Sequence, residues 1–244
     1  MEEHVRPEWH FMGMTFWADT LLFTWLVMVV LIIFGYIAGR RATSGIPDRI
    51  VALWEFVIDF VAKIVADNTD YKKMAGLLAY LVTLIMFIFV SNMLGLFPNF
   101  TFGLGHLHTA GNAMSPTADL NLTLALATMT IVLAQYYGIK YNGTHYFGHF
   151  FSPHWLFFPI HAIELLTKPV TLAFRLYGNI FAGEVLIKVL LTFIPFGLVY
   201  VLGGFIPHVI WLAFSVFVGA IQSFVFTVLT IVYISQAIGS ADSH

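Results

Sequence analysis

The chain has 244 residues, of which 59% are hydrophobic and only 10% charged, and its net charge is −2. A soluble domain carries roughly 25% charged residues, so the composition indicates a membrane protein and gives no sign of a nucleic-acid partner. The chain has no cysteine, which excludes disulfides and thiolate metal sites. Its apolar runs are continuous, which favours membrane helices over barrel strands, because barrel strands alternate over about 10 residues.

Five apolar segments predict membrane helices, at 21–38, 74–96, 118–137, 160–193 and 207–236. The segment 1–20 before them begins with acidic residues, unlike a secretory signal. The segment 48–67 differs in character, because its apolar residues recur at helical spacing opposite Glu55, Asp59 and Lys63. It predicts an amphipathic helix at the membrane surface rather than a span. We therefore expect an all-α polytopic membrane protein that forms a single integral membrane unit, 1–244.

The last two segments are too long for ordinary spans. At 1.5 Å per residue, 160–193 and 207–236 predict helices of roughly 50 Å and 45 Å, whereas the hydrocarbon core is about 30 Å thick. We expect two strongly tilted helices that form a hairpin, together covering 160–236. The alternative is that Pro169 ends the first of these helices early.

Positive charge predicts the orientation. Six cationic residues lie between the first two predicted spans: Arg40, Arg41, Arg49, Lys63, Lys72 and Lys73. The loops at 97–117 and 194–206 contain no Lys or Arg. The positive-inside rule therefore places 40–73 in the cytoplasm, the N-terminus outside and the C-terminus in the cytoplasm.

Arg175 is the most informative residue, because apolar sequence flanks it on both sides. An arginine stays protonated at physiological pH, and placing one near a bilayer centre costs about 2.5–3.5 kcal/mol on insertion scales. On a helical wheel, several polar residues fall within about 40° of it. They are His161, Glu164, Lys168, Thr171 and Asn179. Glu184 falls on the opposite face, so the helix has one polar stripe and a separate carboxyl group.

Two other predicted spans carry polar stripes. The final helix presents Ser215, Gln222, Tyr233 and Gln236 on one face, with His208 near its start. The third span begins with Asp119 and Asn121. Structural interpretations remain open for some of these residues. Hydrogen bonding between helices would also explain Thr123, Thr128, Gln135 and Ser215, and Glu164 with Lys168 would form an ion pair one turn apart.

A metal site is a further interpretation, because His145 and His149 have a spacing that chelates on a helix, and His154 follows. The segment contains Gly148 and Pro153 but no acidic residue, so we expect neither a metal nor a cofactor.

Three blocks of sequence resemble subunit a of the rotary F-type ATP synthase. They are 168–184 (KPVTLAFRLYGNIFAGE), 222–233 (QSFVFTVLTIVY) and 116–121 (PTADLN). Their order and spacing agree with the family, and the resemblance covers about 20–236. It departs from some relatives at Ser215, where they carry a histidine, and at His161, where they carry a glutamate.

The resemblance implies a non-catalytic stator subunit with two offset half-channels for protons, or for Na⁺ in some relatives. Its partners would be a ring of c subunits, the peripheral-stalk b subunits and the lipid bilayer. One copy would sit in a hetero-oligomeric complex in the bacterial plasma membrane. In this resemblance Arg175 faces the carboxylates of the c-ring, and Asn179, Glu184 and Gln222 match polar positions associated with the ion path.

The residues divide between the two expected paths. We expect Glu184, Asp119, Asn121 and Ser215 to line the outer half-channel. We expect Glu164, His161 and Tyr233 to line the inner one, with Lys168 on the same stripe. The alternative functions are an autonomous secondary transporter or ion channel, for which no inverted repeat is seen, and a histidine-dependent membrane enzyme.

Overall fold

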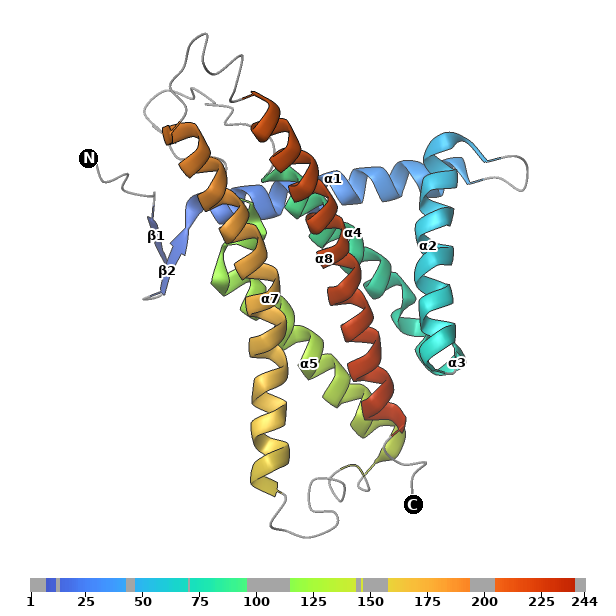
Figure 1. Ribbon diagram of the computed structural model, residues 1–244. Coiled ribbons are helices and arrows are strands. Elements are labelled where there is room, and N and C mark those ends of the chain that lie inside the picture. Colours follow the sequence, from blue (N-terminus) through green and yellow to red (C-terminus); the bar gives the residue numbers. More distant parts are fainter. Residues whose placement is uncertain are drawn as a thin grey trace. The chain divides into compact units, whose positions relative to one another are not determined.

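The computed structural model describes residues 8–11, 14–42, 47–69, 71–95, 115–143, 146, 158–193 and 205–239. The elements in chain order are β1 (Glu8–Phe11), β2 (Met14–Trp17), α1 (Ala18–Arg41), α2 (Arg49–Asn68), α3 (Tyr71–Met74), η1 (Ala75–Leu77), α4 (Leu78–Leu94), η2 (Pro116–Ala118), α5 (Leu120–Asn142), α7 (Phe158–Phe193) and α8 (Phe205–Gly239) (Figure 1). Apart from the antiparallel β1–β2 hairpin, these elements are helical. The expected all-α polytopic membrane fold is confirmed.

Four helices within the described ranges are long and apolar enough to cross a membrane: Thr20–Arg41, Ala75–Leu94, Leu120–Asn142 and Val209–Gly239. They correspond to the first, second, third and last of the five predicted spans. α7 corresponds to the remaining one but is not in this set. Glu164, Lys168 and Arg175 interrupt the apolar sequence of its first half.

The last two helices are long and unbroken. α7 has 36 residues and α8 has 35, and each is one continuous helix (Figure 1). Pro169 lies inside α7, so the alternative in which this proline ends the helix is wrong. At about 1.5 Å per residue each helix is roughly 50 Å long, well above the hydrocarbon thickness of about 30 Å. The tilt itself stays a prediction.

The chain divides into two compact units, each built from three stretches of sequence. Unit 1 contains Met1–Ile33, Met86–Asp119 and Leu176–Ser223, and unit 2 contains Phe34–Ile85, Leu120–Arg175 and Phe224–His244. Consequently α1, α4, α7 and α8 each contribute to both units. Apolar side chains such as Val27 and Ile88 are buried in unit 1, and Leu81, Phe226 and Ile231 in unit 2.

Unit 2 holds the amphipathic helix α2. The Asp48 side chain caps its start by accepting a hydrogen bond from the Arg49 N–H at 2.8 Å. The helix buries Val51, Val61 and Val65. Its charged residues Glu55, Asp59 and Lys63 are exposed. Its placement at a membrane surface stays a prediction.

Side-chain to backbone hydrogen bonds join the helices of unit 2. The Tyr141 hydroxyl donates to the Lys73 carbonyl at 2.9 Å, and Asn142 Nδ2 donates to the Ala237 carbonyl at 2.9 Å. These bonds hold the end of α5 against α3 and against the end of α8. α5 also supplies one wall of a cavity in unit 2.

Candidate functional site

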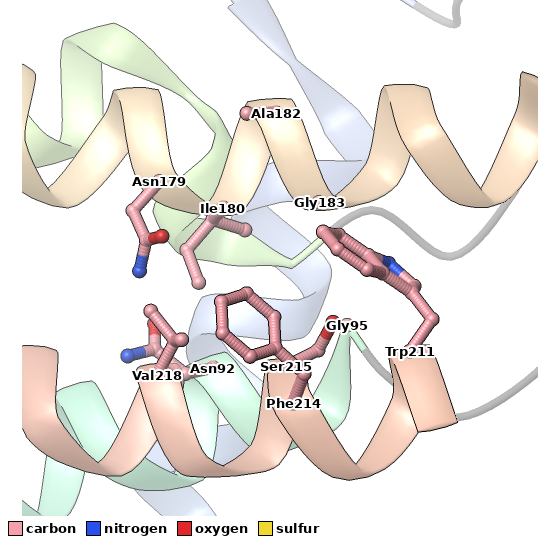
Figure 2. Close-up of a pocket in the computed structure, with 10 residues that line it drawn as sticks. All are labelled: Asn92, Gly95, Asn179, Ile180, Ala182, Gly183, Trp211, Phe214, Ser215 and Val218. Atoms are coloured by element: carbon pink, nitrogen blue, oxygen red, sulfur yellow. The ribbon is translucent and has the colours of Figure 1, made fainter. Parts of the chain in front are cut away.

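Unit 1 encloses a cavity of about 230 Å³ that we call the unit-1 cavity. It is lined from α4, the Leu176–Phe193 part of α7, and α8 (Figure 2). The lining residues are Asn92, Gly95, Asn179, Ile180, Ala182, Gly183, Trp211, Phe214, Ser215 and Val218. Figure 2 shows Asn179 extending from α7 toward the side where Asn92 and Val218 lie.

A buried polar network holds one wall of the unit-1 cavity. Asn92, only 1% exposed, donates from Nδ2 to the Gly219 carbonyl at 3.0 Å. Its Oδ1 accepts a hydrogen bond from the Thr117 hydroxyl at 2.7 Å. Ser115 bonds to Thr117 at 2.6 Å and donates to the Ser91 carbonyl at 2.7 Å. The network therefore ties the end of α4 both to η2 and to α8.

Two polar atoms on the same cavity wall lack a protein partner. Ser215 Oγ and Trp211 Nε1 are buried and make no hydrogen bond within the described part of the chain. Both residues lie on α8, one turn apart. Buried polar groups almost always have a partner, either from the protein or from ordered water. These two atoms are exceptions to that rule within the described part of the chain.

Unit 2 encloses a larger cavity of about 560 Å³, the unit-2 cavity. It is lined from α5, the Phe158–Arg175 part of α7, the end of α8, and Tyr146. The lining residues are Ile131, Ala134, Gln135, Tyr146, His161, Glu164, Leu165, Lys168, Tyr233, Gln236, Ala237 and Gly239. Its wall is richer in ionisable groups than that of the unit-1 cavity.

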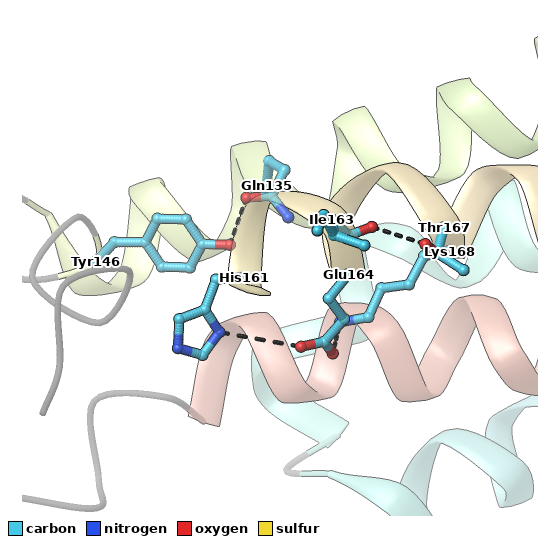
Figure 3. Close-up of polar contacts among 7 residues, drawn as sticks. All are labelled: Gln135, Tyr146, His161, Ile163, Glu164, Thr167 and Lys168. Carbon is cyan, nitrogen blue, oxygen red and sulfur yellow. Dashed lines mark hydrogen bonds and ion pairs between the residues drawn. The ribbon is translucent and has the colours of Figure 1, made fainter. Parts of the chain in front are cut away.

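Glu164 is the centre of a charged cluster in the unit-2 cavity (Figure 3). Lys168 Nζ lies 2.9 Å from Glu164 Oε1, and His161 Nδ1 lies 3.9 Å from Glu164 Oε2. The Lys168 ammonium also lies 5.5 Å from the centre of the Tyr233 ring, within the range of a cation–π contact. The polar stripe predicted on this helix therefore faces a cavity along His161, Glu164 and Lys168.

A tyrosine closes another side of the unit-2 cavity. The Tyr146 hydroxyl donates to Gln135 Oε1 at 2.5 Å (Figure 3). The ring lies against Gly138, where an added Cβ would come within 2.5 Å of Tyr146 Cε2. Burial raises the pKa of the Tyr146 phenol above its ordinary value, because it disfavours the charged phenolate. The phenol is therefore a protonated donor at neutral pH.

Arg175 lies at the end of the α7 stretch that belongs to unit 2. Its side chain is exposed and makes no hydrogen bond or ion pair with the described residues of that unit. The neighbouring large apolar side chains Val170 and Phe174 are also exposed, at 44% and 51%. The guanidinium thus lies on an exposed part of α7, and an exposed apolar face adjoins its polar stripe. On α8, Gln222 is buried, and its Nε2 atom has no partner within the described residues.

The structure groups the predicted site residues as follows. Asn179 and Ser215 share the unit-1 cavity, and His161, Glu164, Lys168 and Tyr233 share the unit-2 cavity. Asp119 and Asn121 line neither cavity, and Asn121 is exposed. The side chains of Glu184 and His208 lie outside the described part, as do the histidines of the metal interpretation, His145, His149 and His154. Within the described part of the chain, no group of three His, Cys, Asp or Glu side chains that could hold a metal ion occurs.

Sequence reasoning missed Asn92, Trp211 and Tyr146. Asn92 was visible as a polar residue inside an apolar run, and Trp211 lies one turn before Ser215 on the polar side of the last helix. Tyr146 offered no such signal, because it follows the third predicted span in the sequence and only the folded chain brings it to Gln135.

Comparisons with known proteins agree on one family. The ATP synthase A chain family matches residues 21–235. The chain is 44% identical to ATP synthase subunit a of Desulforamulus reducens, over 97% of this chain and 86% of the relative. It is 40% identical to the subunits a of Priestia megaterium and Bacillus subtilis, over 97% and 93% of this chain and 98% and 95% of those relatives. The chain is an integral membrane protein and belongs to the ATP synthase subunit a family.

Proposed function

We propose that this chain moves protons through two offset half-channels and couples that movement to rotation of a c-ring in an F-type ATP synthase. The order of residues along α7 carries the proposal. The residues of α7 that line the unit-2 cavity, His161 to Lys168, precede Arg175, and those that line the unit-1 cavity, Asn179 to Gly183, follow it. Arg175 therefore lies between the two sets of lining residues in the order of the chain along α7.

The last helix supports the same division in reverse order. The α8 residues that line the unit-1 cavity fall between Trp211 and Val218, and those that line the unit-2 cavity fall between Tyr233 and Gly239. Gln222, a buried polar residue, lies between the two sets. We assign the unit-1 cavity to the outer half-channel, with Glu184, Asp119 and Asn121 as further outer residues, and the unit-2 cavity to the inner one.

The chemistry of Arg175 suits a barrier between the paths. A cation favours the ionised form of a nearby carboxyl group, so a ring carboxyl that arrives at Arg175 loses its proton. Arginine does not release its own proton, and it therefore cannot pass protons from one cavity to the other. The exposed apolar residues around Arg175 supply a surface along which lipid-facing ring helices pass.

The subunit itself is non-catalytic in this proposal. Its partners are the c-ring and the peripheral-stalk b subunits, in the bacterial plasma membrane. The N-terminus lies outside and the C-terminus lies in the cytoplasm, because Lys and Arg concentrate between the first two spans.

The test is ATP-driven proton pumping by the assembled complex in vesicles, with Arg175→Ala as the variant. We expect pumping to be lost while ATP hydrolysis by the complex persists. Phe174→Leu is the matched control, because Phe174 is the adjacent exposed residue, and it should pump normally. Full ATP-coupled pumping by Arg175→Ala would refute the proposal.

A second variant addresses the outer path. In Glu184→Gln we expect slower passive proton conduction and a changed pH dependence, because the amide cannot bind and release a proton. Unchanged conduction would remove Glu184 from the path. The alternative, an autonomous transporter, is tested with the chain expressed alone in vesicles. If the chain is such a transporter, it should move its ion without a ring.

A further inference from the structure

The turn after α5 brings Tyr146 back onto that helix. Gly143 has a φ of +57°, and its N–H donates to the Ile139 carbonyl at 2.8 Å, which ends the helix in the left-handed conformation that glycine favours. The Tyr146 N–H donates to the Gly143 carbonyl at 3.3 Å. The Tyr146 ring then packs against Gly138, where a side chain would collide with it. The turn thus places Tyr146, only 5% exposed, on the wall of the unit-2 cavity.

The Tyr146 phenol fixes the orientation of one amide on the same cavity. Its hydroxyl donates to Gln135 Oε1 at 2.5 Å (Figure 3). A glutamine amide has an acceptor oxygen and a donor NH2 group, and the surrounding hydrogen bonds determine which way it points. Because Tyr146 engages the oxygen of Gln135, the NH2 group is the end that is left for the cavity.

The Gln135 nitrogen is open to solvent. Nε2 donates a hydrogen bond to no described residue, and it is not among the buried atoms that lack a partner. Gln135 lines the unit-2 cavity, so the cavity is where solvent reaches it. Gln222 Nε2 differs, because it is buried without a partner among the described residues. α5 therefore offers the cavity a donor of fixed orientation, whereas α7 offers it the Glu164 carboxylate, an acceptor.

We propose that Gln135 is a further residue of the inner path and that Tyr146 is its positioning residue, whose phenol holds the amide oxygen so that the NH2 group donates into the unit-2 cavity. Tyr146 acts through Gln135 and does not itself pass protons. The role in proton movement rests on the proposed function, because the inner path is part of it. The fixed orientation of the amide and its contact with water do not, so they are tested separately.

The orientation is tested by solid-state NMR on the assembled complex, with ¹⁵N-labelled glutamine in this subunit. The Gln135 side-chain resonance, assigned by its loss in Gln135→Leu, should receive magnetisation from water faster than that of Gln222, whose nitrogen is buried. Its ¹⁵N–¹H dipolar coupling should be that of a rigid amide in the wild type and smaller in Tyr146→Phe, because the amide is then free to rotate. Transfer no faster than for Gln222, or an unchanged coupling in Tyr146→Phe, would overturn the proposal.

The consequence for the inner path is tested by passive proton conduction per assembled complex. We expect conduction to fall about tenfold in Gln135→Leu and about threefold in Tyr146→Phe, which keeps the ring but removes the donor. The double variant should lose no more than Gln135→Leu alone, because Tyr146 acts through that residue. Independent roles would instead give a loss of about thirtyfold. That result, or normal conduction in either single variant, would overturn the proposal.

Tyr141→Phe is the matched control. The Tyr141 hydroxyl lies near the same end of α5 but donates to the Lys73 carbonyl at 2.9 Å, and neither residue lines the unit-2 cavity. Conduction and the Gln135 coupling should be unchanged in this variant, and a loss equal to that of Tyr146→Phe would overturn the specific role of Tyr146. A failure of the proposed function would instead appear as persistent ATP-coupled pumping in Arg175→Ala, with the NMR signals of Gln135 intact.

Discussion

Asn92 Nδ2 donates a hydrogen bond to the carbonyl oxygen of Gly219 at 3.0 Å, which joins the end of α4 to the middle of α8 within unit 1. The bond is possible because Gly219 has no side chain. A Cβ there would lie 3.2 Å from Asn92 Cβ and 3.3 Å from Met93 Cε. The close approach also places Asn92 on the wall of the unit-1 cavity. This pair of residues thus holds α4 against α8 and places one polar side chain on the cavity wall.

Removal of the Asn92 amide should destabilise the chain. Asn92→Ala leaves the buried Thr117 hydroxyl without its acceptor and removes the bond to Gly219, at a cost of about 2–3 kcal/mol in the free energy of unfolding. Asn68→Ala is the control, because its Nδ2 bond to the Ile64 carbonyl is exposed and a surface change is usually within about 0.5 kcal/mol. Thermal unfolding of the purified complex measures both, and equal midpoints would contradict the prediction.

Two glycines should resist replacement, to different degrees. At Gly95 an added Cβ would lie 2.5 Å from Ser115 Cβ and 3.1 Å from Ser115 Cα, so backbone must move. At Gly219 the nearest atoms are side-chain atoms at 3.2 Å and beyond. We expect Gly95→Ala to reduce assembly more than Gly219→Ala, measured as subunit retained in purified complex. Gly39→Ala, with nothing within 4 Å, should assemble normally, and a loss there equal to that at Gly95 would contradict the steric argument.

The part of the site that the sequence predicted is the part that depends on the helical periodicity of its polar residues. His161, Glu164 and Lys168 share one face of any helix that contains them, so their common face followed from spacing alone. The length of the apolar runs likewise predicted α7 and α8. Pro169 was ambiguous, because a proline removes a backbone donor but a membrane helix tolerates it when neighbours satisfy the freed carbonyl.

The unpredicted part of the site depends on contacts between segments far apart in the chain. Asn92 meets Gly219, and Tyr146 meets Gln135, only through tertiary packing. Periodicity within one helix carries no information on such pairs. Asp119 does not line the unit-1 cavity, and its expected place on the outer path stays a prediction.

The Glu164–Lys168 ion pair should matter for conduction more than for stability. Their side chains are 55% and 28% exposed, and pairs of this kind contribute about 1 kcal/mol or less. We expect Glu164→Gln, Lys168→Gln and the double variant to show a coupling energy below about 1 kcal/mol in thermal unfolding. Passive proton conduction should fall in each variant, because the unit-2 cavity loses its charged groups.

An ion pair outside both cavities serves as the control for that cycle. Arg41 Nη1 lies 3.1 Å from Asp48 Oδ2, with both side chains more than half exposed. Arg41→Gln should leave proton conduction unchanged. If conduction were normal in Glu164→Gln and Lys168→Gln, the pair would serve structure alone and the inner path would have to avoid it.

Tyr146 should make stability depend on pH in the alkaline range. Burial raises its folded-state pKa above the unfolded value of 10.0, so the unfolded chain loses the phenol proton first. The stabilisation is therefore complete below pH 10.0 and is lost as pH rises through the folded pKa. One proton accounts for a slope of at most about 1.4 kcal/mol per pH unit. Tyr146→Phe has no proton to lose, so its stability should fall less steeply than that of the wild type.

The measurement is the thermal midpoint of the purified complex from neutral pH to above pH 10.0, for the wild type and for Tyr146→Phe. Parallel pH curves for the wild type and Tyr146→Phe would show that the phenol keeps its ordinary pKa in the folded protein. Tyr146 would then lie in contact with water rather than closing the unit-2 cavity.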